Sequence, residues 1–76
     1  MRNTYILYGT EFCHLCDEAK VILRLTGIEA GYIDIAADDD LLEKYGIRIP
    51  VLKRVDTGAE LGWPFDALAV SRFLAL

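Results

Sequence analysis

The 76-residue sequence contains little that would hold a metal ion or a set of structural disulfides. Its two cysteines are Cys13 and Cys16, and its one histidine, His14, lies between them. Structural zinc takes four protein ligands in tetrahedral geometry, and this short motif does not supply four. The sequence therefore predicts no metal centre within a single chain.

Positive charge and long hydrophobic runs are also scarce. Eight Lys and Arg stand against twelve Asp and Glu, which gives a formal net charge of −4. Nucleic acids and anionic membranes bind clusters of Lys and Arg, so neither is an expected partner. No stretch approaches the ~20 apolar residues that span a bilayer, and residues 1–8 lack the pattern of a secretory signal. We therefore expect a cytoplasmic protein.

What is present suits one small folded domain. Hydrophobic residues make up 54% of the chain and charged residues 26%, a composition typical of soluble globular domains. A chain of this length is near the lower limit for a hydrophobic core that is stable by itself. We predict a single domain over residues 1–76 and expect a monomer.

Strand and helix patterns alternate along the chain. β-branched and aromatic residues predict strands at 4–8, 31–35, 50–55 and 59–61. Apolar spacings and glycine stops predict helices at about 13–26, at 41–46 and from 65 or 66 to the C-terminus. Three aspartates at 38–40 are interpreted as a solvated helix cap rather than a cation site. The predicted buried faces are Leu15, Ala19, Ile22, Leu23 and Thr26 in the first helix, and Leu68, Phe73 and Leu74 with Val70 or Ala69 in the last.

The resulting order, β-α-β-α-β-β-α, predicts an α/β fold. Two strands joined by a helix are expected to be parallel, with a right-handed crossover. The last two strands are expected to form an antiparallel hairpin around the turn at 56–58.

The motif Cys13-His14-Leu15-Cys16 follows a strand and a loop and opens a helix. Free backbone N–H groups at a helix N-terminus stabilise a thiolate, which makes Cys13 the expected nucleophile. Cys16, one turn later, is placed to displace a mixed disulfide. The carboxylates of Glu11 and Asp17 oppose this thiolate.

Pro50 is the second notable residue, because it opens a predicted strand. At that position a proline removes no ladder hydrogen bond, and this is the simpler interpretation. The alternative is a cis Ile49–Pro50 bond near the cysteines, with the backbone of Ile49 free to pair with an extended substrate. Only about one X–Pro bond in twenty is cis, so the residues alone favour trans.

Several motifs together resemble a known family. A strand ending in Tyr-Gly, the Cys-x-x-Cys motif and the later Ile-Pro-Val resemble glutaredoxins and thioredoxins over essentially the whole chain. Leu7-Tyr8-Gly9-Thr10, Cys13 to Ala19, Tyr45-Gly46 and Pro64-Phe65-Asp66 are similar to glutaredoxin-like proteins grouped as a domain of unknown function. This resemblance implies a thioredoxin (glutaredoxin-like) fold, with a four-stranded mixed sheet in the order 2-1-3-4 and helices on both faces. It also implies a cis proline at Pro50.

The resemblance further implies roles for individual residues. Cys13 matches the nucleophile and Cys16 the resolving thiol, and Ile49 would offer its backbone to glutathione or a peptide. Asp66 matches an acidic residue that helps to hold the glutamyl end of glutathione.

The sequence departs from glutaredoxins around the expected glutathione groove. Thr10 stands where a lysine is usual, and His14-Leu15 replace Pro-Tyr. Arg48 replaces a threonine and is a candidate cation for a substrate carboxylate. Trp63 replaces a glycine and would fill space that a tripeptide backbone needs. We therefore expect weaker glutathione binding than in an ordinary glutaredoxin, and a groove suited to a protein or larger thiol partner.

The function expected from these features is thiol–disulfide exchange without a bound cofactor. The substrate would be a disulfide-containing protein or a small thiol compound, with glutathione as a possible co-substrate. Two alternatives stay open. One is a dimer that holds an iron–sulfur cluster through Cys13 of each chain. The other is a regulatory or interaction domain that kept the fold and lost the activity.

Overall fold

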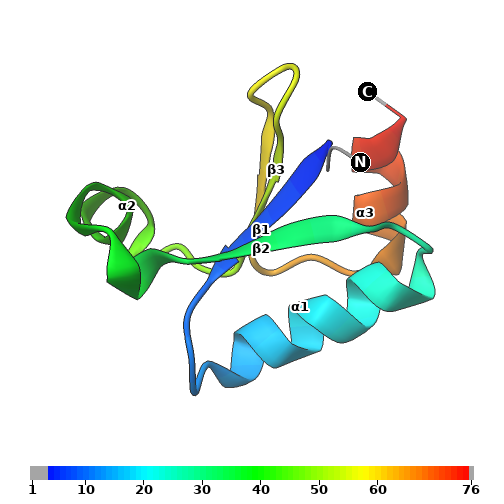
Figure 1. Cartoon of the computed structure of the whole chain (residues 1–76). Coiled ribbons are helices and arrows are strands. Elements are labelled where there is room, and N and C mark those ends of the chain that lie inside the picture. The colour runs from blue at the N-terminus through cyan, green and yellow to red at the C-terminus, as the bar shows by residue number, and fades with distance from the viewer. Residues whose placement is uncertain (1–3, 76) are drawn as a thin grey trace.

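Four strands form one mixed sheet in the order β2-β1-β3-β4 in a computed structural model that describes residues 4–75. The strands are β1 (Tyr5–Gly9), β2 (Ala30–Asp34), β3 (Val51–Arg54) and β4 (Glu60–Gly62). β1 is central and pairs parallel with β2 and antiparallel with β3, while β3 and β4 form the expected antiparallel hairpin. The predicted strand order and mixed pairing are confirmed (Figure 1).

Three α-helices and one short 3-10 helix connect the strands. They are α1 (His14–Leu25), η1 (Ile35–Ala37), α2 (Asp39–Tyr45) and α3 (Ala67–Leu74). Figure 1 shows α2 at the end of the sheet away from α3. Among residues 4–75, no helix has the length and apolar character that crossing a membrane requires.

Most predicted bounds differ from the structure by one or two residues, and aspartate side chains explain two of these differences. Ile35, predicted as the end of the second strand, begins η1, because Asp34 accepts a hydrogen bond from the Ala36 N–H at 2.9 Å and turns the chain. α2 begins at Asp39 instead of residue 41, because the Asp38 carboxylate accepts from the N–H groups of Asp40 and Leu41. The interpretation of this acidic segment as a helix cap is confirmed.

Two hydrophobic clusters cover the two faces of the sheet. Successive strand residues point to opposite faces, and the pairing of Leu7 with Leu52 and of Tyr8 with Val51 separates them accordingly. The first face packs against α1 and α3, and its buried residues are Leu7, Ala19, Leu23, Leu52, Phe65, Val70 and Phe73. The second packs against η1 and α2, and its buried residues are Tyr8, Ile35, Tyr45 and Val51. Helices therefore cover both faces, as expected.

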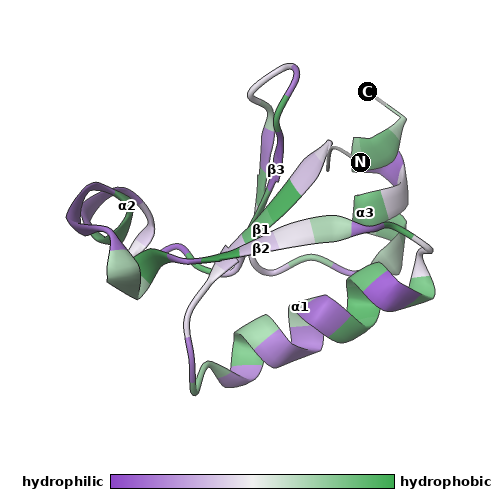
Figure 2. Cartoon of the chain, in the orientation of Figure 1, coloured by the Kyte–Doolittle hydropathy of each residue, from purple (hydrophilic) through white to green (hydrophobic). Residues whose placement is uncertain are grey.

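Two predicted core residues, Leu15 and Leu68, are exposed. In α1 the inward positions are Cys16, Ala19 and Leu23, and Leu15 lies about 100° around the helix from Cys16. In α3 the inward positions are Val70 and Phe73, and Leu68 lies two residues before Val70, on the opposite side. The alternating purple and green along α1 in Figure 2 reflects its two different faces.

Candidate functional site

Cys13 caps the N-terminus of α1. Its sulfur accepts a hydrogen bond from the Cys16 N–H at 3.1 Å, the role that a Ser or Asp oxygen commonly fills at a helix start. The backbone of Cys13 is extended, as is usual for a capping residue. The predicted position of the motif at the strand-to-helix junction is confirmed, and a backbone donor points at the expected nucleophile.

Cys13 and Cys16 form a disulfide, with their Cα atoms 5.1 Å apart. This separation lies in the usual range for bridged cysteines. The two residues differ in access, because Cys13 is partly exposed and Cys16 is fully buried. A partner can therefore reach Cys13 from solvent, while Cys16 lies behind it.

Gly9 lies against the buried sulfur and the Tyr32 hydroxyl lies beside Gly9, and sequence reasoning missed both. A Cβ atom added at Gly9 would lie 3.0 Å from the Cys16 Sγ and 3.0 Å from the Tyr32 hydroxyl. The end of β1 therefore packs directly against Cys16, and only a glycine leaves room for this contact. The detectable signal was the glycine at the strand end; nothing local to Tyr32 indicated its position.

Both a positive and several negative side chains lie near Tyr32. Lys20 places its Nζ 4.1 Å from the centre of the Tyr32 ring. Partial burial raises the pKa of Tyr32, and the carboxylates of Asp34, Asp17 and Glu11 raise it further. Tyr32 thus stays protonated at neutral pH beside the buried cysteine.

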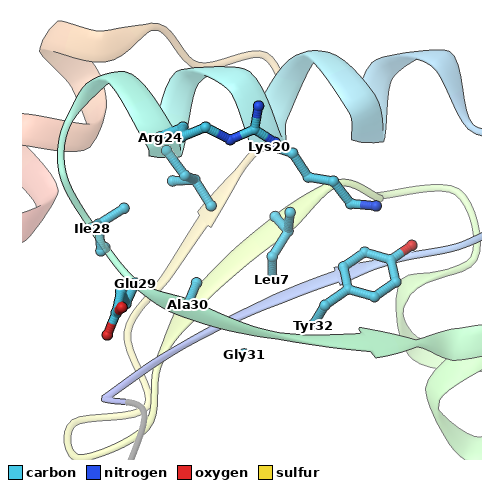
Figure 3. A pocket seen from close by; sticks show the side chains of 9 residues that line it. Leu7, Lys20, Arg24, Ile28, Glu29, Ala30, Gly31 and Tyr32 are labelled. Carbon is cyan, nitrogen blue, oxygen red and sulfur yellow. The ribbon is translucent and has the colours of Figure 1, made fainter.

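Tyr32 also lines a groove between α1 and β2 (Figure 3). The groove has a volume of about 480 Å³. Lys20 and Arg24 extend over it from α1, and Ala30, Gly31 and Tyr32 form its other wall (Figure 3). Tyr32 therefore links this groove to the immediate surroundings of Cys16.

The Pro50 loop lies at the same end of the sheet as the cysteines. Tyr8 pairs with Val51, so the next residues along, Gly9 and Pro50, both lie where β1 ends and β3 begins. Pro50 is buried, and the Ile49–Pro50 peptide bond is cis. The Trp63–Pro64 bond is also cis, which the sequence did not lead us to expect.

Trp63 adjoins Pro50 but packs largely with the core. Its backbone N–H donates a hydrogen bond to the Pro50 carbonyl at 3.2 Å. Its ring lies edge-on to Phe65 with the ring centres 5.0 Å apart, and it is half-buried against the first cluster. The Trp63 side chain, which was expected to fill the glutathione groove, is thus partly packed against the core.

Arg48 is paired with another part of the chain. Its guanidinium lies 3.0 Å from the Glu60 carboxylate on β4, and the Tyr45 hydroxyl donates to the same carboxylate. Burial by itself would raise the pKa of Glu60, but the hydrogen bonds from Tyr45 and Arg48 outweigh it and lower the pKa. A substrate carboxylate would therefore compete with Glu60 for Arg48.

Asp66 caps α3. Its carboxylate accepts from the Ala69 N–H at 2.8 Å, and the residue is exposed. It borders a shallow hollow of about 340 Å³ that Pro64, Phe65 and Ala69 also line. Asp66, which was expected to bind substrate, therefore also stabilises the start of α3.

Metal ligands are not grouped in the described part of the chain. Within residues 4–75, no three His, Cys, Asp or Glu side chains come together in a way that could hold a metal ion. The site consists of the disulfide and the polar and aromatic groups around it.

Comparison with known proteins places this geometry in a family. The sequence profile of the Glutaredoxin-like domain (DUF836) matches residues 4–75. A crystal structure of protein XcR50 from X. campestris is 39% identical, covers 93% of this chain and 95% of its own, and has a TM-score of 0.86. The solution structure of XcR50 is 37% identical, covers 95% and 92%, and has a TM-score of 0.85.

Protein Ne2328 from Nitrosomonas europaea, solved in solution, is 29% identical, with coverage of 96% and 98% and a TM-score of 0.71. A search among curated proteins found no match. The family match spans nearly the whole chain, and the structural neighbours share its sheet and helices. The chain therefore belongs to the glutaredoxin-like domain family (DUF836) and has a thioredoxin-like fold.

Proposed function

We propose that this chain is a thiol–disulfide oxidoreductase in which Cys13 is the nucleophile and Cys16 the resolving thiol. The observation that carries the proposal is the asymmetry of the pair. Cys13 is partly exposed and its sulfur accepts a backbone hydrogen bond, whereas Cys16 is buried behind it. A hydrogen-bond donor at a helix N-terminus stabilises the thiolate that attacks a disulfide.

The reaction takes place in two exchanges. In the reduced protein, the Cys13 thiolate attacks one sulfur of a substrate disulfide, forming a mixed disulfide and releasing the first substrate thiol. The Cys16 thiolate then attacks the Cys13 sulfur and releases the second substrate thiol. The two cysteines lose two electrons as their disulfide forms, and the substrate disulfide gains them as it becomes two thiols.

The substrate is proposed to lie along the Pro50 loop, with the backbone of Ile49 as its hydrogen-bonding partner. Weak glutathione binding is proposed because Thr10 supplies no charge and Arg48 already pairs with Glu60. Asp66 retains an exposed carboxylate for an ammonium group. We propose that the protein acts as a cytoplasmic monomer without a bound cofactor.

The test uses variants that separate the two thiols. Reduced wild-type protein should reduce hydroxyethyl disulfide, and Cys13→Ser should abolish this reaction. Cys16→Ser should instead accumulate the mixed disulfide on Cys13, detected by mass spectrometry. A Cys16 that alkylates faster than Cys13, or a Cys13→Ser variant with full activity, would contradict the proposal. Brown colour in freshly purified protein would favour the cluster-bridged dimer instead.

A further inference from the structure

Phe12 projects into solvent beside the nucleophile. The residue immediately precedes Cys13, its side chain is fully exposed, and its backbone has a φ of 57°. A bulky residue in this left-handed region is unusual and strained, and strain of this kind concentrates at functional sites. Nothing within residues 4–75 covers this ring, so it offers a free aromatic surface next to the reactive sulfur.

Carboxylates from three elements surround the same end of the sheet. Glu11 lies in the loop before Cys13, and Asp17 lies in the first turn of α1. Asp34 ends β2 and pairs in register with Gly9, the residue packed against the Cys16 sulfur. None of the three forms an ion pair inside the described range.

The nearby cations do not balance this charge. Lys20 lies one turn beyond Cys16 and contacts the Tyr32 ring, and Arg48 is paired with Glu60. The charged side chains around the disulfide are therefore predominantly negative. Such a charge distribution attracts cationic partners and repels anionic ones, most strongly at low ionic strength.

We propose that the Cys13–Cys16 site prefers positively charged peptide or protein disulfides that carry an apolar side chain beside their cysteine. The inference rests on the proposed exchange activity and adds its substrate class. Phe12 receives the apolar side chain, and the three carboxylates favour the positive charge. Glutathione disulfide, which carries more carboxylates than ammonium groups, is correspondingly disfavoured.

The test compares three symmetric disulfides of short peptides with blocked ends. Each peptide has phenylalanine before its cysteine and lysine, glutamine or glutamate after it, so that the disulfides are positive, neutral or negative. The initial rate with reduced protein is divided by the rate with dithiothreitol, which removes the intrinsic reactivity of each disulfide. We expect the normalised rate to be about tenfold higher for the positive than for the negative disulfide at low salt, and this ratio to fall at high salt.

Two variants with the same net charge identify the cause. Glu11→Gln with Asp17→Asn should reduce the ratio severalfold. Glu29→Gln with Asp56→Asn removes the same charge away from the cysteine end of the sheet and should leave the ratio unchanged. Equal losses in both double variants would mean that overall charge, and not the site, sets the preference, and would overturn the proposal.

Phe12→Ala tests the aromatic contact. Because the ring is fully exposed, its loss should leave the folded state intact. It should slow the neutral peptide disulfide severalfold more than it slows hydroxyethyl disulfide, which has no side chain for the ring to contact. Unchanged rates with the peptide, or equal normalised rates for all three charges in the wild type, would overturn the substrate preference. Absence of reaction with hydroxyethyl disulfide would instead overturn the proposed function itself.

Discussion

At the residue scale, close contacts around Cys16 and Glu60 determine which substitutions the packing tolerates and which side chains are hydrogen-bonded. Gly9 can lie against the Cys16 sulfur because it has no Cβ. The Glu60 carboxylate accepts hydrogen bonds from Tyr45 and Arg48. The Tyr45 ring stacks on the Tyr8 ring with the ring centres 4.5 Å apart. These contacts connect Tyr8 near the end of β1, through α2, to β4 and to Arg48 in the loop before Pro50.

Gly9→Ala should destabilise the protein by about 1–3 kcal/mol, because the added methyl group overpacks the contact between β1 and Cys16. Urea unfolding of the oxidised and reduced forms measures this loss. Gly62→Ala is the matched control, since a Cβ there has no atom within 4 Å. Equal effects of the two substitutions would show that Gly9 is not closely packed.

Glu60 should make stability depend on acid pH. In the folded protein the pKa of Glu60 is lowered from its usual 4.5. Ionised Glu60 therefore stabilises the folded state above pH 4.5, and this stabilisation is lost as the pH falls through the lower pKa of the folded protein. Glu60→Gln should therefore lose less stability than wild type between about pH 7 and about pH 3.

Chemical denaturation at the two pH values gives the comparison. Glu43→Gln, at an exposed position on α2, should behave as wild type. An identical pH dependence for Glu60→Gln and wild type would contradict the assignment.

At the element scale, side chains rather than regular periodicity determine where the helices begin. Cys13, Asp38 and Asp66 cap α1, α2 and α3 in turn. The cap of α1 is also the expected nucleophile, so the start of this helix and the proposed chemistry depend on the same sulfur. Asp66 likewise combines a cap with a candidate binding role.

Two substitutions separate the roles of Asp66. Asp66→Ala should cost about 1 kcal/mol through the lost cap, whereas Asp66→Asn keeps the cap and should cost a few tenths of a kcal/mol. If the carboxylate also holds a substrate ammonium group, both variants should reduce a glutathionylated peptide more slowly. Full activity of Asp66→Asn would leave capping as its role.

At the scale of the whole molecule, two small clusters on opposite faces of one sheet hold the fold together. Each cluster has few fully buried side chains, so the domain depends on each of them. A small domain of this kind has a free energy of unfolding of about 5–15 kcal/mol. Loss of one central side chain therefore removes a large part of its stability.

Leu52→Ala should lower the free energy of unfolding by about 2–5 kcal/mol, because Leu52 is fully buried in the first cluster. Leu68→Ala should change it by less than about 0.5 kcal/mol, because Leu68 is exposed. Guanidinium unfolding of both variants checks this. A large loss for Leu68→Ala would instead support the original prediction of a buried residue.

The sequence by itself determined the order of strands and helices and the position of the cysteine pair at a helix start. These features depend on periodicity, capping and turn residues within a few positions of one another. The errors at residues 35 and 41 arose where an aspartate side chain competed with the strand or helix pattern.

Only the tertiary structure decided which distant residues meet. Gly9 and Tyr32 lie on different strands, and their approach to Cys16 depends on the register between β1 and β2. The pairing of Arg48 with Glu60 joins residues twelve positions apart, and the burial of Cys16 in place of Leu15 depends on the rotation of α1 against the sheet. Such contacts depend on how whole elements pack, and a pattern confined to one element carries no information about its neighbours.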